Sequence, residues 1–116
     1  MPNFNTAPQQ HEVKLFERID FEAINRSALS VFPSLLERWL PNGRAEGKEY
    51  VALNPRRADR NLGSFRINTR NGKWADFAVK GASGGDVISL TAYLFNLTQV
   101  EAARKLAAMM GIRAYE

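Results

Sequence analysis

The sequence predicts an α+β domain, in which an N-terminal helical segment and two C-terminal helices pack against a three-stranded antiparallel sheet. Three observations lead to this fold class. Apolar residues recur at helical spacing across residues 20–40. Apolar and polar residues then alternate through residues 64–68, and an Asn-Gly pair follows them. After a glycine-rich turn, helical spacing returns in residues 86–95 and 99–110.

The composition is that of one ordinary globular domain. The chain has 116 residues, of which 45% are hydrophobic and 24% charged, and it contains no cysteine. A disulfide framework and a thiolate zinc site are therefore excluded. No apolar run approaches the roughly 20 residues of a membrane span, and the N-terminus lacks a signal-peptide pattern, so we expect a cytoplasmic protein. Residues 1–12 are polar and aperiodic, which predicts a disordered tail before a single domain over residues 13–116.

The N-terminal part of the domain is predicted to be helical. Residues 13–19 are expected to form a short helix or a linker that docks on the core. In residues 20–40, Asp20 is placed to cap the first turn. Pro33 interrupts the segment, which predicts either a kinked helix or two helices with Pro33 in the first turn of the second.

Three short strands are expected between residues 48 and 78, over residues 49–53, 64–68 and 73–78. Asn71 and Gly72 lie between the last two strands and supply the positive φ that a tight hairpin needs. The alternation is clear in the second strand. In the third strand Trp74 and Phe77 are out of phase, which indicates a bulge or burial on both faces.

Two C-terminal helices are predicted over residues 86–95 and 99–110. Asp86 suits the N-cap of the first helix. Thr98 and Glu101 form a capping box at the start of the second, and Gly111 is typical of a left-handed C-cap. The glycine-rich turn at residues 83–86 could cradle a phosphate, but it lacks a complete phosphate-binding motif, so helix capping is the favoured interpretation.

Positive charge is concentrated in the middle of the chain. Residues 38–80 hold ten basic and four acidic residues, a net charge of +6, while the whole chain carries +4. This asymmetry favours an anionic partner, and a solvated surface is the alternative. We predict that phosphate groups are contacted by six of these basic residues: Arg56, Arg57, Arg60, Arg66, Arg70 and Lys73.

Aromatic residues are interleaved with the basic ones in the same segment. Such an arrangement is typical of surfaces that bind unpaired bases, because every base has a face that can stack on a ring. We assign stacking to Tyr50, Phe65 and Trp74. Packing in the core is the alternative for each of them, since aromatic residues dominate small cores.

Five short segments follow one another in an order that resembles a known family: YVALNP at residues 50–55, GSFRI at 63–67, WADF at 74–77, GGD with VISL from residue 84, and EAARKLAAMMGI from residue 101. Together they resemble the N-terminal zinc-ribbon domain of bacterial and phage primases. The resemblance covers residues 48–112. It implies a zinc-ribbon-like sheet and binding of the single-stranded DNA template, with polymerisation in a separate domain.

The sequence departs from that family at the metal ligands. Asn54 stands at the position of the first cysteine and Arg57 at that of the histidine, and the later cysteine pair falls near Ala78 and Gly81. None of these residues can form a thiolate or imidazole zinc site. The resemblance therefore implies a metal-free relative, similar to the primase-like domains of replication proteins on phages and integrative mobile elements.

No catalytic set is apparent in the sequence. We find neither a carboxylate pair nor a histidine-based triad, so we expect no enzyme activity and no cofactor. The expected function is non-catalytic binding of single-stranded DNA, or RNA, as the template-contacting module of a primase-like replication protein. The alternative is a protein-interaction module that docks on a replication helicase or primase through the C-terminal helices, which a large exposed apolar patch on them would favour.

Overall fold

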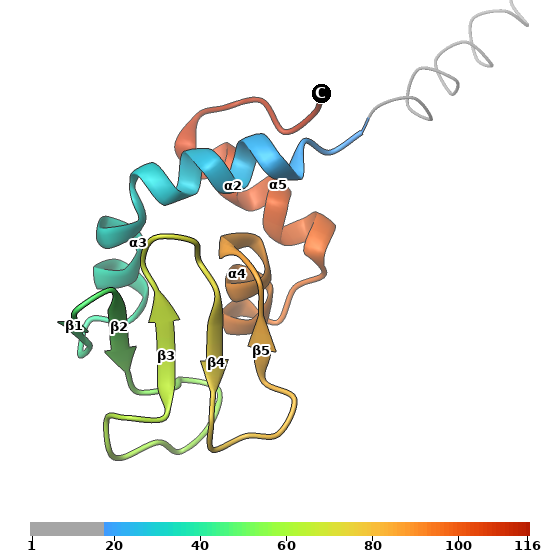
Figure 1. Ribbon diagram of the computed structural model, residues 1–116. Helices are drawn as coiled ribbons and strands as arrows, with labels where there is room; N and C mark the ends of the chain where they lie inside the picture. Colours follow the sequence, from blue (N-terminus) through green and yellow to red (C-terminus); the bar gives the residue numbers. More distant parts are fainter. Residues whose placement is uncertain (1–17) are drawn as a thin grey trace, which may run out of the picture.

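The computed structural model describes residues 18–116 and shows an α+β fold (Figure 1). Within this range there are four helices and one five-stranded antiparallel sheet. The α+β class is therefore confirmed, whereas the prediction of only three strands is wrong. The predicted tail over residues 1–12, and most of the segment 13–19, lie outside the described residues.

The helical segment predicted over residues 20–40 consists of two helices, α2 (Phe21–Ser30) and α3 (Phe32–Trp39). Asp20 Oδ1 accepts a hydrogen bond of 3.1 Å from the Ala23 amide and caps α2 as predicted. Pro33 lies in the first turn of α3. Proline has no N–H to donate, and only the first turn of a helix leaves that group without an intrahelical partner. The two-helix alternative is therefore confirmed.

The sheet has the strand order β1-β2-β3-β4-β5. The strands are β1 (Arg44–Glu46), β2 (Glu49–Ala52), β3 (Phe65–Asn68), β4 (Trp74–Asp76) and β5 (Ser83–Gly84). The three central strands correspond to the predicted ones, and the two edge strands are additional. Each edge strand has at most three residues and no apolar alternation. They were not predictable from periodicity because they add backbone hydrogen bonds to the sheet without contributing a core face.

The register gives the sheet one face that the helices cover and an opposite face that is only partly open, since Val51 of β2 is fully buried there. Tyr50, Ile67 and Trp74 are direct neighbours across β2, β3 and β4, and all three are buried. Arg66 and Ala75 pair with each other on the opposite face and are half-buried. Figure 1 shows the sheet in front, with α4 behind its β5 side and α2 and α5 above it. We call the face of Arg66 and Ala75 the outer face.

The two C-terminal helices agree with the predicted ones and are α4 (Val87–Phe95) and α5 (Gln99–Met110). Asp86 caps α4 by accepting a hydrogen bond of 2.8 Å from the Ser89 amide. Thr98 and Glu101 form the predicted capping box of α5, and Gly111 ends that helix with a φ of 69°. Local sequence therefore determines where both helices begin.

The core lies between the inner sheet face and the helices. Its largest fully buried apolar side chains come from helices and strands alike: Ile24, Phe32, Leu36, Phe65, Ile67, Ile88, Leu90 and Leu106. Ile19 and Tyr115 form an isolated β-bridge, which joins the segment before α2 to the segment after α5. No helix in residues 18–116 is long and apolar enough to cross a membrane.

Gly72 is required by the β3–β4 hairpin for two separate reasons. Its φ is 82°, as the predicted turn demands. A Cβ atom on Gly72 would also lie 2.9 Å from the Val87 backbone nitrogen, at the start of α4. Gly47, in the β1–β2 turn, has a φ of 63° as well, but a Cβ atom there would meet nothing within 4 Å. Substitutions at Gly72 and Gly47 therefore distinguish the effect of backbone strain from that of a steric clash.

We predict that Gly72→Ala lowers the free energy of unfolding by more than Gly47→Ala does. The change at Gly47 carries only left-handed backbone strain, about 1–2 kcal/mol. The change at Gly72 adds a clash with α4, for which we expect at least about 1 kcal/mol more. Urea unfolding followed by tryptophan fluorescence measures both values. Equal destabilisation would show that the hairpin does not pack against the start of α4.

Candidate nucleic-acid interface

A buried carboxylate, that of Asp76, organises the end of the sheet beside the basic loop between β2 and β3. The Asp76 side chain is fully buried. Asn54 Nδ2 and Arg57 Nε each donate to Asp76 Oδ2 at 2.8 Å, and the Ala78 amide donates to Oδ1 at 2.9 Å. A buried charge is strongly unfavourable unless it is paired and hydrogen-bonded. These contacts are what permit Asp76 to be buried in its charged form.

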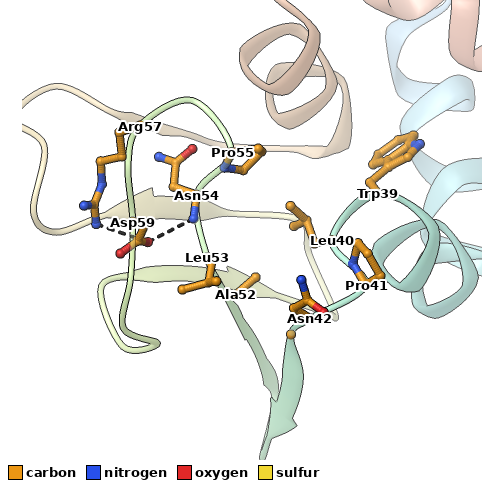
Figure 2. A pocket seen from close by; sticks show the side chains of 11 residues that line it. Trp39, Leu40, Pro41, Asn42, Ala52, Leu53, Asn54, Pro55, Arg57 and Asp59 are labelled. Carbon is orange, nitrogen blue, oxygen red and sulfur yellow. Dashed lines mark hydrogen bonds and ion pairs between the residues drawn. The ribbon is translucent and has the colours of Figure 1, made fainter.

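Asp59 is a second carboxylate that pairs with Arg57 (Figure 2). Arg57 Nη2 lies 3.2 Å from Asp59 Oδ2, and the Asn54 amide donates to the same oxygen at 2.9 Å. Arg57 Nη2 also donates to the Ser64 hydroxyl at 2.6 Å. The guanidinium of Arg57 thus bridges one carboxylate of the loop and one of β4. We call Asn54, Arg57, Asp59 and Asp76 the polar cluster.

Tyr93 connects the polar cluster to helix α4. Its hydroxyl accepts a hydrogen bond of 2.8 Å from Asn54 Nδ2, and its carbonyl accepts one of 2.8 Å from Arg56 Nη1. The Arg56 guanidinium also lies over the Tyr93 ring, 5.4 Å from its centroid. The basic loop is therefore held against both the sheet and α4.

The contacts of the polar cluster lower the pKa of Asp76. Burial acts to raise that pKa, but hydrogen bonds from Arg57, Asn54 and the Ala78 amide outweigh burial and hold it well below its ordinary value. The hydrogen bond to Asp76 is also the main reason why the pKa of Arg57 is raised. Both groups are consequently charged at neutral pH.

The six basic residues predicted to contact phosphate fall into two groups. Arg57 and Arg66 are engaged in ion pairs, and Arg66 Nη1 lies 3.0 Å from Glu49 and 3.5 Å from Glu46. The other four are exposed, and within residues 18–116 they form no ion pair: Arg56, Arg60, Arg70 and Lys73. Arg60, Arg70 and Lys73 are available to an anion, whereas Tyr93 engages Arg56 and Arg57 serves the folded structure.

The three aromatic residues predicted to stack on bases are buried. The exposed fractions of Tyr50, Phe65 and Trp74 are 7%, 0% and 6%. The Tyr50 hydroxyl donates to the Leu40 carbonyl at 2.6 Å, and Trp74 Nε1 donates to the Ser89 hydroxyl at 2.9 Å. All three rings lie on the sheet face that the helices cover. Core packing is therefore the correct interpretation, and the assignment of base stacking to these rings is wrong.

Phe77 is the aromatic residue that the sheet exposes. Its exposed fraction of 76% is the largest among the large hydrophobic residues of the described chain. Lys73, Ala75 and Phe77 alternate onto the outer face, where Arg66 lies opposite Ala75 and a hollow of about 210 Å³ runs along these residues. The sequence contained a signal for this arrangement, since residues three apart on a strand, such as Trp74 and Phe77, point to opposite faces. The out-of-phase pattern thus reflects exposure of Phe77.

A second hollow, of about 280 Å³, lies between the turn after α3 and the loop after β2 (Figure 2). Trp39 and Pro41 line one side of it, and Asn54, Arg57 and Asp59 line the other. These polar side chains already bond to one another or to Asp76. They have little hydrogen-bonding capacity left for a ligand, so the outer face is the stronger candidate site.

The positions that would carry zinc ligands in the resembled family lie at this end of the sheet. Asn54 and Arg57 belong to the polar cluster, the Ala78 amide donates to Asp76, and Gly81 has a φ of 84° in the turn before β5. Within residues 18–116, no group of three or more His, Cys, Asp or Glu side chains is placed to hold a metal ion. No protein-family model and no curated protein sequence matches the chain.

We predict that Asp76→Asn lowers the free energy of unfolding by about 2 kcal/mol or more at neutral pH, because it breaks a buried ion pair. Glu22→Gln is the matched control. Glu22 is 90% exposed, and among residues 18–116 its one ion pair is with the exposed Arg26, so its change should stay within about 0.5 kcal/mol. Urea unfolding measures both values, and equal effects of the two changes would contradict a structural role for Asp76.

The contribution of Asp76 should also depend on pH. Its pKa is lower in the folded than in the unfolded chain, so its stabilisation is fully present above the unfolded-state pKa of about 3.9 and is lost as the pH falls through the folded-state pKa. The difference between the wild type and Asp76→Asn should be constant from about pH 7 to 5 and smaller at about pH 3. Unfolding curves at these pH values test it, and a difference unchanged at the lowest pH would disprove the pKa shift.

Proposed function

We propose that the chain binds single-stranded nucleic acid, without catalysis, through the outer face of its sheet. The observation that carries this proposal is the exposed ring of Phe77 on the same face as Lys73 and Arg66. An exposed ring among cations suits a ligand in which unpaired bases are joined by phosphates. The proposal keeps the predicted ligand class and replaces the predicted stacking residues.

The charges around the outer face favour an anionic ligand. The nearby carboxylates are already paired, since each lies within 3.5 Å of an arginine: Asp59 and Asp76 of Arg57, and Glu46 and Glu49 of Arg66. Three exposed cations have no such partner among residues 18–116, one in the loop between β2 and β3 and two in the β3–β4 hairpin: Arg60, Arg70 and Lys73. Phosphate oxygens can therefore approach these cations without displacing an ion pair.

The proposed contacts carry little sequence information. Long basic side chains reach phosphates, which are the same in every strand, and a phenyl ring stacks on any base. Arg66 lies between Lys73 and Phe77 on the outer face, but Glu46 and Glu49 hold its guanidinium. We therefore expect it to contribute less to binding than the unpaired cations do.

The polar cluster supports a relationship to the zinc-ribbon domain of primases. We propose that the chain is a metal-free relative of that domain and acts in the cytoplasm as the template-contacting module of a primase-like replication protein. Asn54 and Arg57 stand at two of the family's ligand positions, and both bind Asp76. Their hydrogen bonds fasten the loop to β4, as a shared metal ion would do.

We predict that Phe77→Ala weakens binding to single-stranded DNA by at least about fivefold, because stacking is worth about 1–3 kcal/mol per base. Phe95→Ala is the matched control: Phe95 is an exposed phenylalanine too, at 50%, but it lies on α4. Fluorescence anisotropy with labelled oligonucleotides of two unrelated sequences gives the affinities, and melting curves confirm folding. If Phe77→Ala and the wild type bind with equal affinity, the Phe77 ring does not contact the nucleic acid.

We further predict that neutralising the exposed cations reduces the dependence of binding on salt. Changing Arg60, Arg70 and Lys73 together to alanine should flatten the slope of log K against log[salt] by about 2, because fewer counterions are released. The control removes the same charge from α2, α5 and the segment after α5: Arg26, Lys105 and Arg113 to alanine. If the two triple variants lose affinity equally, or if the wild type does not bind single strands at low salt, the proposed function is refuted.

A further inference from the structure

The helices form an apolar groove on a part of the molecule that the proposed nucleic-acid interface does not use. One hollow, of about 420 Å³, lies between α5 and the α2–α3 pair and includes Val31, Leu35 and Ile112 in its lining. A second, of about 260 Å³, lies among α3, α4 and α5 and includes Trp39 and Phe95. Met109 lines both hollows. We call the two hollows together the helix groove.

The helix groove exposes large apolar side chains to solvent. Val31, Phe95 and Met109 are 41%, 50% and 43% exposed. They account for three of the six large hydrophobic residues that are exposed in the described chain. Trp39 and Phe95 meet edge to face with their centroids 5.5 Å apart, which gives the groove a rigid aromatic wall. Contiguous exposed apolar surface of this kind is typical of interaction sites.

The charged residues that line the helix groove are both basic. They are Arg38 and Lys105, and neither forms an ion pair within residues 18–116. Arg38 Nη1 lies 3.9 Å from Met109 Sδ, so positive charge borders the point where the two hollows meet. A partner complementary to this groove has apolar anchors and negative charges beside them.

We propose that the helix groove binds an acidic amphipathic helix of a partner protein. Three helices line the groove, and no strand edge faces it in the part of the chain described, so an added strand has no backbone groups to pair with. An amphipathic helix needs no such groups, because its own backbone is satisfied and its apolar stripe fills the groove. The flexible side chain of Met109 can adapt to anchors of different shape.

The test uses three synthetic peptides of about 16 residues. The first has leucines at positions i, i+3, i+4 and i+7 and glutamates on its other face. The second carries lysines in place of the glutamates, and the third is a scrambled version of the first. Binding of each labelled peptide to the full chain is measured by fluorescence anisotropy. We expect the acidic amphipathic peptide to bind at least about tenfold more tightly than the other two.

Two matched variants locate the binding site. Met109→Glu places a negative charge at the centre of the groove, whereas Val100→Glu makes the same change on the same helix, at a side chain 38% exposed and outside the groove. We expect Met109→Glu to weaken binding of the acidic peptide at least about tenfold and Val100→Glu to change it by less than about twofold. Both variants should retain the melting temperature and the affinity for single-stranded DNA.

Three outcomes would overturn the inference. The acidic peptide could fail to bind at about 1 mM, the lysine peptide could bind equally well, or the two variants could lose affinity equally. Sedimentation analysis adds a fourth: self-association that Met109→Glu abolishes would assign the groove to a second copy of the chain. Because DNA binding is measured on the same variants, failure here is distinguishable from failure of the proposed function.

Discussion

The ion pair between Asp76 and Arg57 is the interaction on which the sheet end of this protein depends. It joins the last residue of β4 to the loop that follows β2, two segments separated by the whole of β3. The Asp76 carboxylate is fully buried and must be neutralised by its neighbours. Asn54 and the Ala78 amide complete its hydrogen bonds, and Asp59 holds the other side of the guanidinium. The polar cluster thus closes the open end of a small sheet through hydrogen bonds and ion pairs between its own side chains.

The alternation along β4 and its two flanking residues, Lys73 and Phe77, assigns side chains to two different tasks. Trp74 and Asp76 point inward, one to the apolar core and one to the polar cluster. Lys73, Ala75 and Phe77 point outward, where helices do not cover them. A shift of one residue in register would exchange these two sets. The pairing that stabilises the core therefore also places a ring and a cation on the outer face.

The two proposed surfaces use different kinds of exposure. On the outer face, a single ring stands among cations whose neighbouring carboxylates are already paired. In the helix groove, several apolar side chains are contiguous, and within residues 18–116 two cations border them. The first suits a flexible polyanion, and the second suits a folded segment with an apolar stripe. Because the surfaces lie on different elements, the two proposed ligands would not compete for the same side chains.

The sequence by itself determined the elements whose signals are local. Asp20, Pro33 and the Thr98–Glu101 box specify helix starts through caps and a missing donor, and Gly72 specifies a turn through its φ. Only the tertiary structure decided the rest. The edge strands exist because neighbouring strands offer them hydrogen bonds. Burial of Tyr50, Phe65 and Trp74, and exposure of Phe77, depend on which sheet face the helices cover, and composition does not contain that information.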